Sequence, residues 1–233
     1  MKHPNGYILY QGPSMLDGAP IVAIAVGLKA KSTNRKTGAM VQTYILRSDV
    51  APLEAIRTGQ DSSICGDCRL RGVLGKKRTC YVNIGQGPRA VYDGFKRGIY
   101  PVADNAAAIG ENRTVRLGTY GDPAAVPVSV WESLISKATG HTGYTHQWRK
   151  TPALRSIVMA SADSLADKAE AWATGWRTFR LADVPTQGEI ACPSLTGVHC
   201  ADCRLCDGAG LARSITVPAH GIGRKYAPME VAA

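Results

Sequence analysis

Runs of apolar and β-branched residues, bounded by turn residues, recur along the first part of the chain and predict strands. They cover Ala19–Leu28 and Met40–Arg47. Gly and Pro punctuate the preceding Tyr7–Asp17, where we expect a loop or a short edge hairpin. A helical turn or two is expected at Pro52–Thr58, and a helix at Pro88–Arg97.

Beyond Asn112 the apolar pattern alternates between short strand-like and longer helix-like segments. Strands are predicted at Thr114–Thr119, Thr142–Thr145, Ser156–Ala160, Trp176–Leu181, Glu189–Ala191 and Ser214–Pro218, and helices at Val126–Ala138 and Leu165–Thr174. This alternation predicts parallel βαβ units and an α/β fold, in the form of a partial (β/α) barrel. We expect one α/β domain over residues 1–190, with a C-terminal Cys-rich segment, 191–233, packed on it.

Composition and charge narrow the class of protein. The 233 residues are 45% hydrophobic, which is enough for an ordinary core, and the net charge of +10 favours a polyanionic partner such as nucleic acid. Such a partner would bind to two basic segments, Lys29–Lys36 and Arg69–Arg78. The longest apolar run, Ala19–Leu28, is too short to cross a bilayer, and the N-terminus lacks an apolar signal region. We therefore expect a cytoplasmic protein without a membrane partner.

The cysteines form two groups with no thiol left over. The first group is Cys65, Cys68 and Cys80; the second is Cys192, Cys200, Cys203 and Cys206. In a reducing compartment, C-x2-C spacings indicate metal binding or catalysis more than disulfides. The simpler alternative is that buried cysteines act as small hydrophobic residues.

The spacing also bears on which metal is bound. A C-x2-C-x2-C run with a further Cys-Pro, here Cys192-Pro193, is typical of a [4Fe-4S] cluster, whereas His199 beside Cys200 keeps zinc as the alternative. A cluster held by the three thiols of the first group would leave one iron open for a substrate or cofactor. The cationic loop between Cys68 and Cys80 is expected to lower the pKa of these thiols.

Polar side chains follow the predicted strands where parallel strands usually carry chemistry. Tyr120-Gly121-Asp122 follows one strand, and His146 and Arg149 follow the next. Asp163 follows a third, although it could equally be a helix N-cap, and His146 could be a core histidine.

Together these residues resemble the radical S-adenosylmethionine (radical SAM) iron-sulfur enzymes. Three cysteines ending in Cys80-Tyr81, a barrel-like α/β chain and Tyr120-Gly121-Asp122-Pro123 at a strand exit carry the resemblance. In that family a three-Cys loop holds a [4Fe-4S] cluster, and a Gly-Gly-Glu-Pro-like strand end holds the amino group of S-adenosylmethionine. The second Cys group is similar to their auxiliary clusters. The chain departs from the family's CxxxCxxC spacing, because eleven residues separate Cys68 from Cys80, and it has Asp122 in place of Glu.

The whole chain also resembles a Cys-rich bacteriophage protein family of unknown function. The shared segments are Asn34-Arg-Lys-Thr-Gly38, the Cys-Tyr segment, the Gly-Asp strand end, Tyr144-Thr-His-Gln-Trp148 and the terminal Cys cluster. This resemblance implies a phage or mobile-element protein that works in the host cytoplasm, and it implies no activity.

Two hypotheses follow. In the first, the chain is a radical-SAM-like iron-sulfur enzyme acting on nucleic acid or a nucleotide, with one or two [4Fe-4S] clusters on the seven cysteines. Its cofactor pocket would be lined by Asn34, Lys36, Tyr120, Gly121 and Asp122, with Asp122, His146, Arg149 and Asp163 as catalytic candidates. In the second, it is a non-catalytic basic protein, stabilised by iron-sulfur or zinc, that binds nucleic acid or a host protein.

Overall fold

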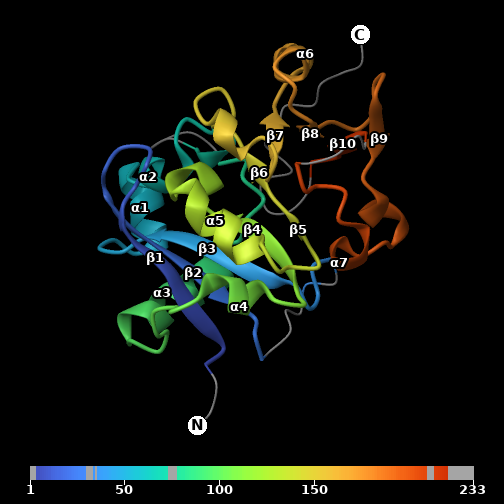
Figure 1. Ribbon diagram of the computed structural model, residues 1–233. Helices are drawn as coiled ribbons and strands as arrows, with labels where there is room; N and C mark the ends of the chain where they lie inside the picture. Colours follow the sequence, from blue (N-terminus) through green and yellow to red (C-terminus); the bar gives the residue numbers. More distant parts are fainter. Residues whose placement is uncertain (1–3, 30–33, 35, 73–77, 209–212, 220–233) are drawn as a thin grey trace.

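The computed structural model describes residues 4–29, 34, 36–72, 78–208 and 213–219, and these form two five-stranded sheets (Figure 1). The strands of the first sheet, in spatial order, are β1 (Gly6–Pro13), β2 (Pro20–Val26), β3 (Val41–Arg47), β4 (Thr114–Tyr120) and β5 (Gly140–Thr142). Those of the second are β6 (Tyr144–Thr145), β7 (Met159–Ala162), β8 (Thr178–Leu181), β10 (Ser214–Val217) and β9 (Glu189–Ala191).

Parallel pairing dominates both sheets. The first sheet is antiparallel from β1 to β3 and parallel from β3 to β5, and every pair of the second sheet is parallel. Helix α5 (Val128–Ile135) connects β4 to β5, and α6 (Leu165–Ala173) connects β7 to β8. The predicted α/β class and its parallel βαβ units are therefore confirmed, because parallel neighbours need such crossovers.

Gly143 joins the two sheets. It is the single residue between β5 and β6, so one extended segment ends the first sheet and begins the second. A Cβ on Gly143 would lie 2.5 Å from the Val158 side chain, which explains why glycine occupies this junction. The strands form two sheets and no closed barrel.

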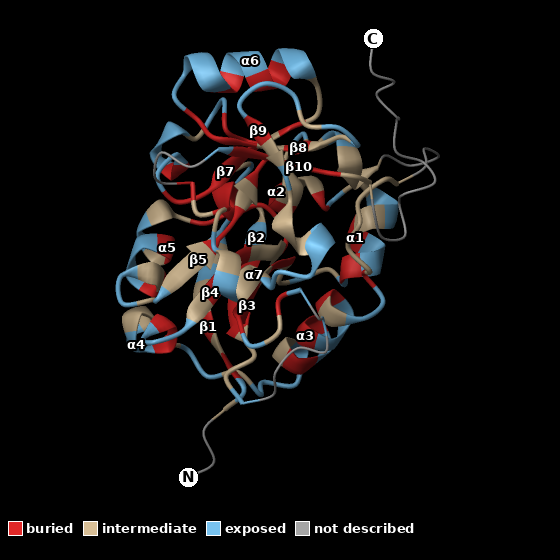
Figure 2. Cartoon of the chain, turned by 90° about the vertical axis from the view of Figure 1, so that its right-hand side faces the viewer, coloured by how far each residue is buried: buried red, intermediate tan, exposed pale blue. Residues whose placement is uncertain are grey.

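The core lies between the strands and the helices that cover them, as the buried strands of Figure 2 show. Ile24 of β2, Ile45 of β3 and Trp131 of α5 are fully buried, and the Trp131 indole donates to the Pro123 carbonyl at 2.9 Å. The remaining helices are α1 (Pro52–Thr58), α2 (Ser62–Cys65), α3 (Gly87–Lys96), α4 (Ala106–Gly110) and α7 (Cys200–Cys203). α2 and α7 each carry cysteines.

The hairpin alternative for Tyr7–Asp17 is confirmed, because this segment contains most of the eight-residue edge strand β1, which pairs antiparallel with β2. Two other segments differ from expectation. The strand expected at Ser156–Ala160 begins only at Met159 and includes Ser161, because Ile157 and Val158 turn back to hydrogen-bond Leu154. Helix α4 was not predicted.

The C-terminal segment belongs to the second sheet. β10 lies between β8 and β9, and β9 spans the expected boundary at residue 190. Among the described residues, no helix is long and apolar enough to cross a membrane.

Candidate metal centre

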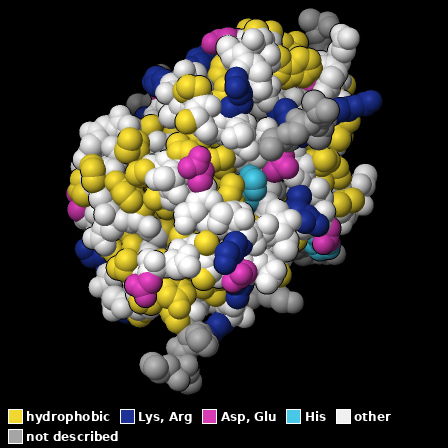
Figure 3. All heavy atoms as spheres, viewed as in Figure 1, with side chains coloured by type: hydrophobic (Ala, Val, Ile, Leu, Met, Phe, Trp, Pro, Cys, Tyr) yellow, Lys and Arg dark blue, Asp and Glu magenta, His cyan; other side chains and the backbone are white. Residues whose placement is uncertain are grey.

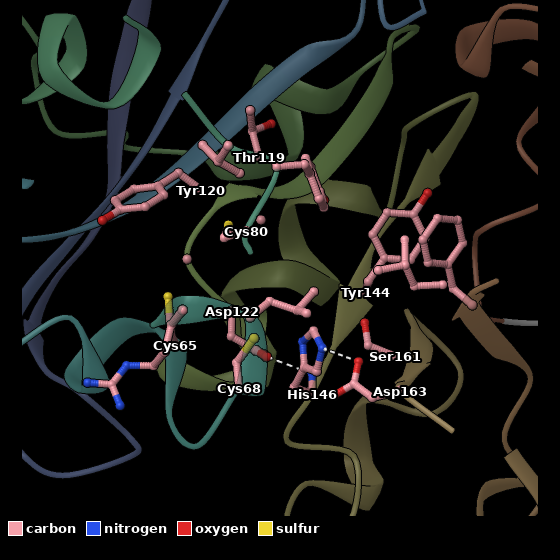
Figure 4. Close-up of a pocket in the computed structure, with 18 of the residues that line it drawn as sticks. Cys65, Cys68, Cys80, Thr119, Tyr120, Asp122, Tyr144, His146, Ser161 and Asp163 are labelled. Carbon is pink, nitrogen blue, oxygen red and sulfur yellow. Dashed lines mark hydrogen bonds and ion pairs between the residues drawn. The ribbon is translucent and has the colours of Figure 1, made fainter. Parts of the chain in front are cut away.

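The first Cys group lies in the segment that follows β3 and α1. Cys65 ends α2, and Cys68 precedes a 3-10 turn at Arg69–Arg71. The Cys80 amide then donates to the Leu70 carbonyl at 2.8 Å, so the chain doubles back and returns Cys80 to the other two. All three thiols border one pocket (Figure 4).

A buried ion pair closes this segment, which we call the Cys loop (residues 61–80). The Arg71 guanidinium contacts the Asp61 carboxylate at 2.9 Å and donates to the Gly59 carbonyl at 2.7 Å. Arg78, two residues before Cys80, donates to the Arg71 carbonyl at 3.0 Å. Burial raises the pKa of Asp61, and Arg71 opposes that rise. Arg71 thus connects Asp61, at the start of the Cys loop, to Arg78, near its end.

The Gly121-Asp122 strand end lies beside the same pocket. Gly121 has φ 82° and a Cβ there would lie 2.6 Å from Ile45, so only glycine fits. The buried Asp122 carboxylate accepts hydrogen bonds from Thr145 Oγ1 at 2.7 Å and from the amides of Ala124 and His146 at 3.0 and 2.8 Å. Asp122 therefore ties β4 to β6, and both its oxygens already have donors.

Tyr120, which lines the same pocket, has a buried hydroxyl. Its side chain is 2% exposed, and the oxygen has no hydrogen-bond partner among the described residues. Burial, with the neighbouring Cys65, raises its pKa well above the ordinary value, so the hydroxyl stays protonated. A buried donor of this kind costs free energy unless a ligand or water satisfies it.

His146 lies between a thiol and a carboxylate. Its Nε2 is 3.3 Å from Asp163 Oδ1 (Figure 4). Burial alone would lower its pKa, but Cys68 and Asp163 outweigh burial and raise the pKa well above 6.5. His146 is thus not an isolated core histidine. The helix-cap alternative for Asp163 is wrong, because the N-cap of α6 is Ser164, whose hydroxyl accepts from the Asp167 amide.

Cys65 and Cys80 do not have the lowered pKa expected from the cationic loop. Burial raises the pKa of Cys65 well above its usual value, with the neighbouring Cys68 and Cys80 adding to the rise. Burial also raises the pKa of Cys80, and Arg78 offsets this only in part. Desolvation outweighs the nearby charge, so a metal would have to displace protons from these thiols.

The second Cys group gathers around the end of β9. The Cys192 amide donates to Thr216 of β10 at 2.8 Å, and the Cys200 amide donates to the Lys36 carbonyl at 2.8 Å. Burial raises the pKa of Cys206 to about 12, with its hydrogen bond to Tyr144 opposing and the three other thiols of the group reinforcing the rise. The four thiols are therefore near enough to influence one another's charge.

The two Cys groups border different pockets. Three aromatic side chains, Tyr81, Tyr144 and Phe179, line both the pocket of the first group and that of Cys192 and Cys200. We call these three side chains the aromatic wall. The seven thiols thus form two neighbouring groups with this wall between their pockets.

The predicted cofactor residues are divided between the same two pockets. Tyr120, Gly121 and Asp122 line the first, whereas Asn34 and Lys36 line the second. The expectation that they share one pocket is wrong, because Lys36 lies against Cys200, whose amide donates to the Lys36 carbonyl.

Arg149 does not face the cysteines. It pairs with Asp167 at 2.7 Å and with Glu170 at 2.5 Å, and it stacks 3.9 Å from the centre of the Trp148 ring. These contacts hold Arg149 against α6, and it lines one pocket together with His146 and Asp163, so its expected catalytic role stays a prediction. The basic segments 29–36 and 69–78 lie partly outside the described residues, at 30–33, 35 and 73–77.

Sequence reasoning missed three residues that shape the site. Asp61 and Arg71 close the Cys loop, and Arg116 lies beside Tyr81, Tyr144 and Cys200. The one available signal was a charged Arg116 between the apolar Val115 and Leu117 of a predicted strand.

Within the described residues, no three His, Cys, Asp or Glu side chains form a group that could hold a metal ion. The pocket of the first group has a volume of about 100 Å³. Comparison of the chain with models of protein families, with curated proteins and with solved structures found no match.

Proposed function

We propose that the chain is an iron-sulfur protein with a radical-SAM-like centre. In this proposal Cys65, Cys68 and Cys80 ligate a [4Fe-4S] cluster, and the second Cys group ligates another. The observation that carries it is the convergence of these three thiols on one pocket, although eleven residues separate Cys68 from Cys80.

The strand order supports the proposal. The Cys loop follows β3, and Gly121-Asp122 ends the neighbouring parallel strand β4. The family resemblance implies this placement: a three-Cys loop and a polar strand end at the same edge of a partial barrel. Parallel pairing continues from β3 to β5 and, past Gly143, from β6 to β9. Such an open series of parallel strands fits a partial (β/α) barrel.

The donor chemistry fits a cluster. Cysteine thiolates are the usual ligands of iron-sulfur centres, and the pocket volume of about 100 Å³ leaves room for a few atoms between the sulfurs. A cluster bonds each thiolate to a different iron, so its thiolates stand farther apart than ligands that share one ion. When bound, such a cluster supplies one-electron transfer.

The surrounding residues have separate tasks. Asp122 fixes the β4 strand end against His146, and the His146–Asp163 pair can hold a proton at Nε2 beside the thiols. These groups position and protonate a bound species.

Two observations favour a second candidate, a non-catalytic metal-stabilised binding protein. The volume of about 100 Å³ is below the roughly 300–1,000 Å³ of most small-molecule sites. Asp122 also has no carboxylate oxygen left without a donor to hold an amino group. In this candidate the clusters, or zinc, would stabilise a basic fold.

Metal analysis of anaerobically purified protein tests the first candidate against the second. Iron with equal acid-labile sulfide, together with methionine release from S-adenosylmethionine under a strong reductant, supports the enzyme. Iron or zinc without that release supports the second candidate. Protein that takes up neither metal contradicts both.

A further inference from the structure

A larger pocket lies on the other side of the aromatic wall from the first Cys group. Its volume is about 450 Å³, within the roughly 300–1,000 Å³ common for small-molecule sites. Lys36 comes from the segment before β3, Arg116 from β4 and Ser194 from the segment after β9. Three distant parts of the chain therefore build one cavity.

The charges on this pocket are uncompensated. Arg116 and Lys36 both line it, and none of its lining residues is Asp or Glu. Among the described residues, neither cation forms an ion pair with a carboxylate. Arg116 interacts with Tyr81, to which it is hydrogen-bonded, and with Tyr144 and Cys200. A partly buried guanidinium without a carboxylate is a ready site for an anionic oxygen group.

Aromatic side chains also line the pocket, beside Arg116. Tyr144 and Phe179 pack with their ring centres 4.2 Å apart and their planes at 38°, and Tyr81 completes the aromatic wall. Aromatic side chains of this kind stack on nucleobases, at about 1–3 kcal/mol per base. The pocket thus offers a cationic end and an aromatic side.

We propose that this pocket binds a nucleotide unit, with its phosphate on Arg116 and Lys36 and its base against the aromatic wall. Two cations match a phosphate monoester, which carries about −1.5 to −2 charges at neutral pH, better than they match a single carboxylate. The nucleotide can be free or part of a single strand, since both present the same groups. Cys192 and Cys200 also line this pocket, so a nucleotide bound there lies beside the second Cys group, and binding measured in both metal states shows whether a metal on that group changes it.

Titration calorimetry on the full chain, with and without metal, tests this proposal. The probes are AMP, adenosine, inorganic phosphate and a short single-stranded oligoadenylate. We expect AMP to bind more tightly than adenosine or phosphate, in both metal states. Preference for oligoadenylate over AMP would assign the site to a strand.

Variants distinguish binding in this pocket from non-specific attraction to the positive charge of the chain. Arg116→Gln and Lys36→Gln should each weaken AMP binding by about 10- to 100-fold, and Arg116→Lys should restore part of it. Lys137→Gln, which removes an exposed lysine that pairs with Glu111, should have no effect. Thermal unfolding of each variant checks that it is folded, and Lys36 is exposed enough to be replaced safely.

Two results would overturn the proposal. One is equal binding of AMP and adenosine, or none of either, by the folded wild-type chain. The other is a loss of iron from the Arg116→Gln protein with no change in AMP binding, since Arg116 would then neutralise the thiolates of Cys192 and Cys200. Neither result bears on whether the first Cys group holds iron.

Discussion

Asp122 holds separate segments together through one buried carboxylate. Its oxygens accept from the Thr145 hydroxyl and from the amides of Ala124 and His146, and its own amide donates to Ile64 at 2.6 Å. The sequence placed Asp122 correctly at a strand exit. It could not show these bonds, because the donors come from segments whose approach depends on the fold.

Asp122→Ala should therefore lower the free energy of unfolding by about 3 kcal/mol. The change leaves two amides and a hydroxyl without their buried acceptor, and each such loss costs about 1–3 kcal/mol before relaxation. Urea denaturation measures the effect. Asp93→Ala, which removes one side of an exposed pair 3.6 Å from Arg89, is the matched control and should change stability little. Equal effects of the two substitutions would contradict this role.

At the scale of elements, the Cys loop shows what spacing can and cannot predict. The eleven residues between Cys68 and Cys80 looked too many for a three-Cys site, yet the Cys80 amide bonds to Leu70 and returns the chain. The closure depends on Asp61 and Arg71, two charged residues with no motif to identify them. Strands and helices followed from apolar periodicity, whereas loop closure depends on side-chain contacts.

Asp61→Asn should reduce the iron held by the first Cys group and spare the second. The change keeps the shape of residue 61 but removes the charge that fixes Arg71, so Cys80 is held less firmly beside Cys68. We expect roughly tenfold weaker iron binding at that group, by analogy with the loss of supporting residues at other metal sites. Competition with a chelator measures it, and Asp93→Asn is the control. If the Asp61→Asn variant keeps its iron against the chelator as well as the wild type does, the role of Asp61 in closing the Cys loop is contradicted.

A buried ion pair connects β8 to β9. Arg180 of β8 contacts Glu189 of β9 at 2.8 Å, and neither side chain is more than 2% exposed. Burial alone would raise the pKa of Glu189, but hydrogen bonds from Arg180 and Thr186 hold it below its usual value. A carboxylate with a lowered pKa stabilises the fold above its unfolded pKa, near 4.3, and this stability is lost as the pH falls through the folded pKa.

Glu189→Gln should accordingly make the free energy of unfolding less dependent on pH under acidic conditions. The wild-type free energy of unfolding should decrease as the pH falls below about 4.3. The variant is already less stable at pH 7, because Arg180 loses its buried partner, and its free energy of unfolding should decrease less over the same pH range. Denaturation between pH 3 and 7 gives both curves. A parallel decline of the two curves would rule out Glu189 as the source.

Across the whole molecule, the sequence predicted the α/β class, the βαβ units and the two Cys groups, but not how the groups are separated. The aromatic wall consists of Tyr81, Tyr144 and Phe179, which come from a loop and two strands, so no local pattern indicated it. The net charge of +10 suggested a basic surface patch, but it does not tell where the charges lie. On the face in Figure 3, Lys and Arg side chains lie among Asp and Glu and form no single basic patch.

The proposal gives each Cys group its own metal, because the two groups border separate pockets. Cys65→Ala should remove the iron of the first group and leave that of the second, and Cys203→Ala should do the reverse. Iron analysis of the two purified variants measures this. Loss of all iron from either one would show a single shared site.

The most direct test of the central claim is iron and acid-labile sulfide analysis of the anaerobically purified chain, with an electron paramagnetic resonance spectrum after reduction. Our account predicts a brown protein with iron and sulfide in equal amounts and the signal of a reduced [4Fe-4S] cluster. A colourless protein that contains zinc, with no such signal, would contradict it.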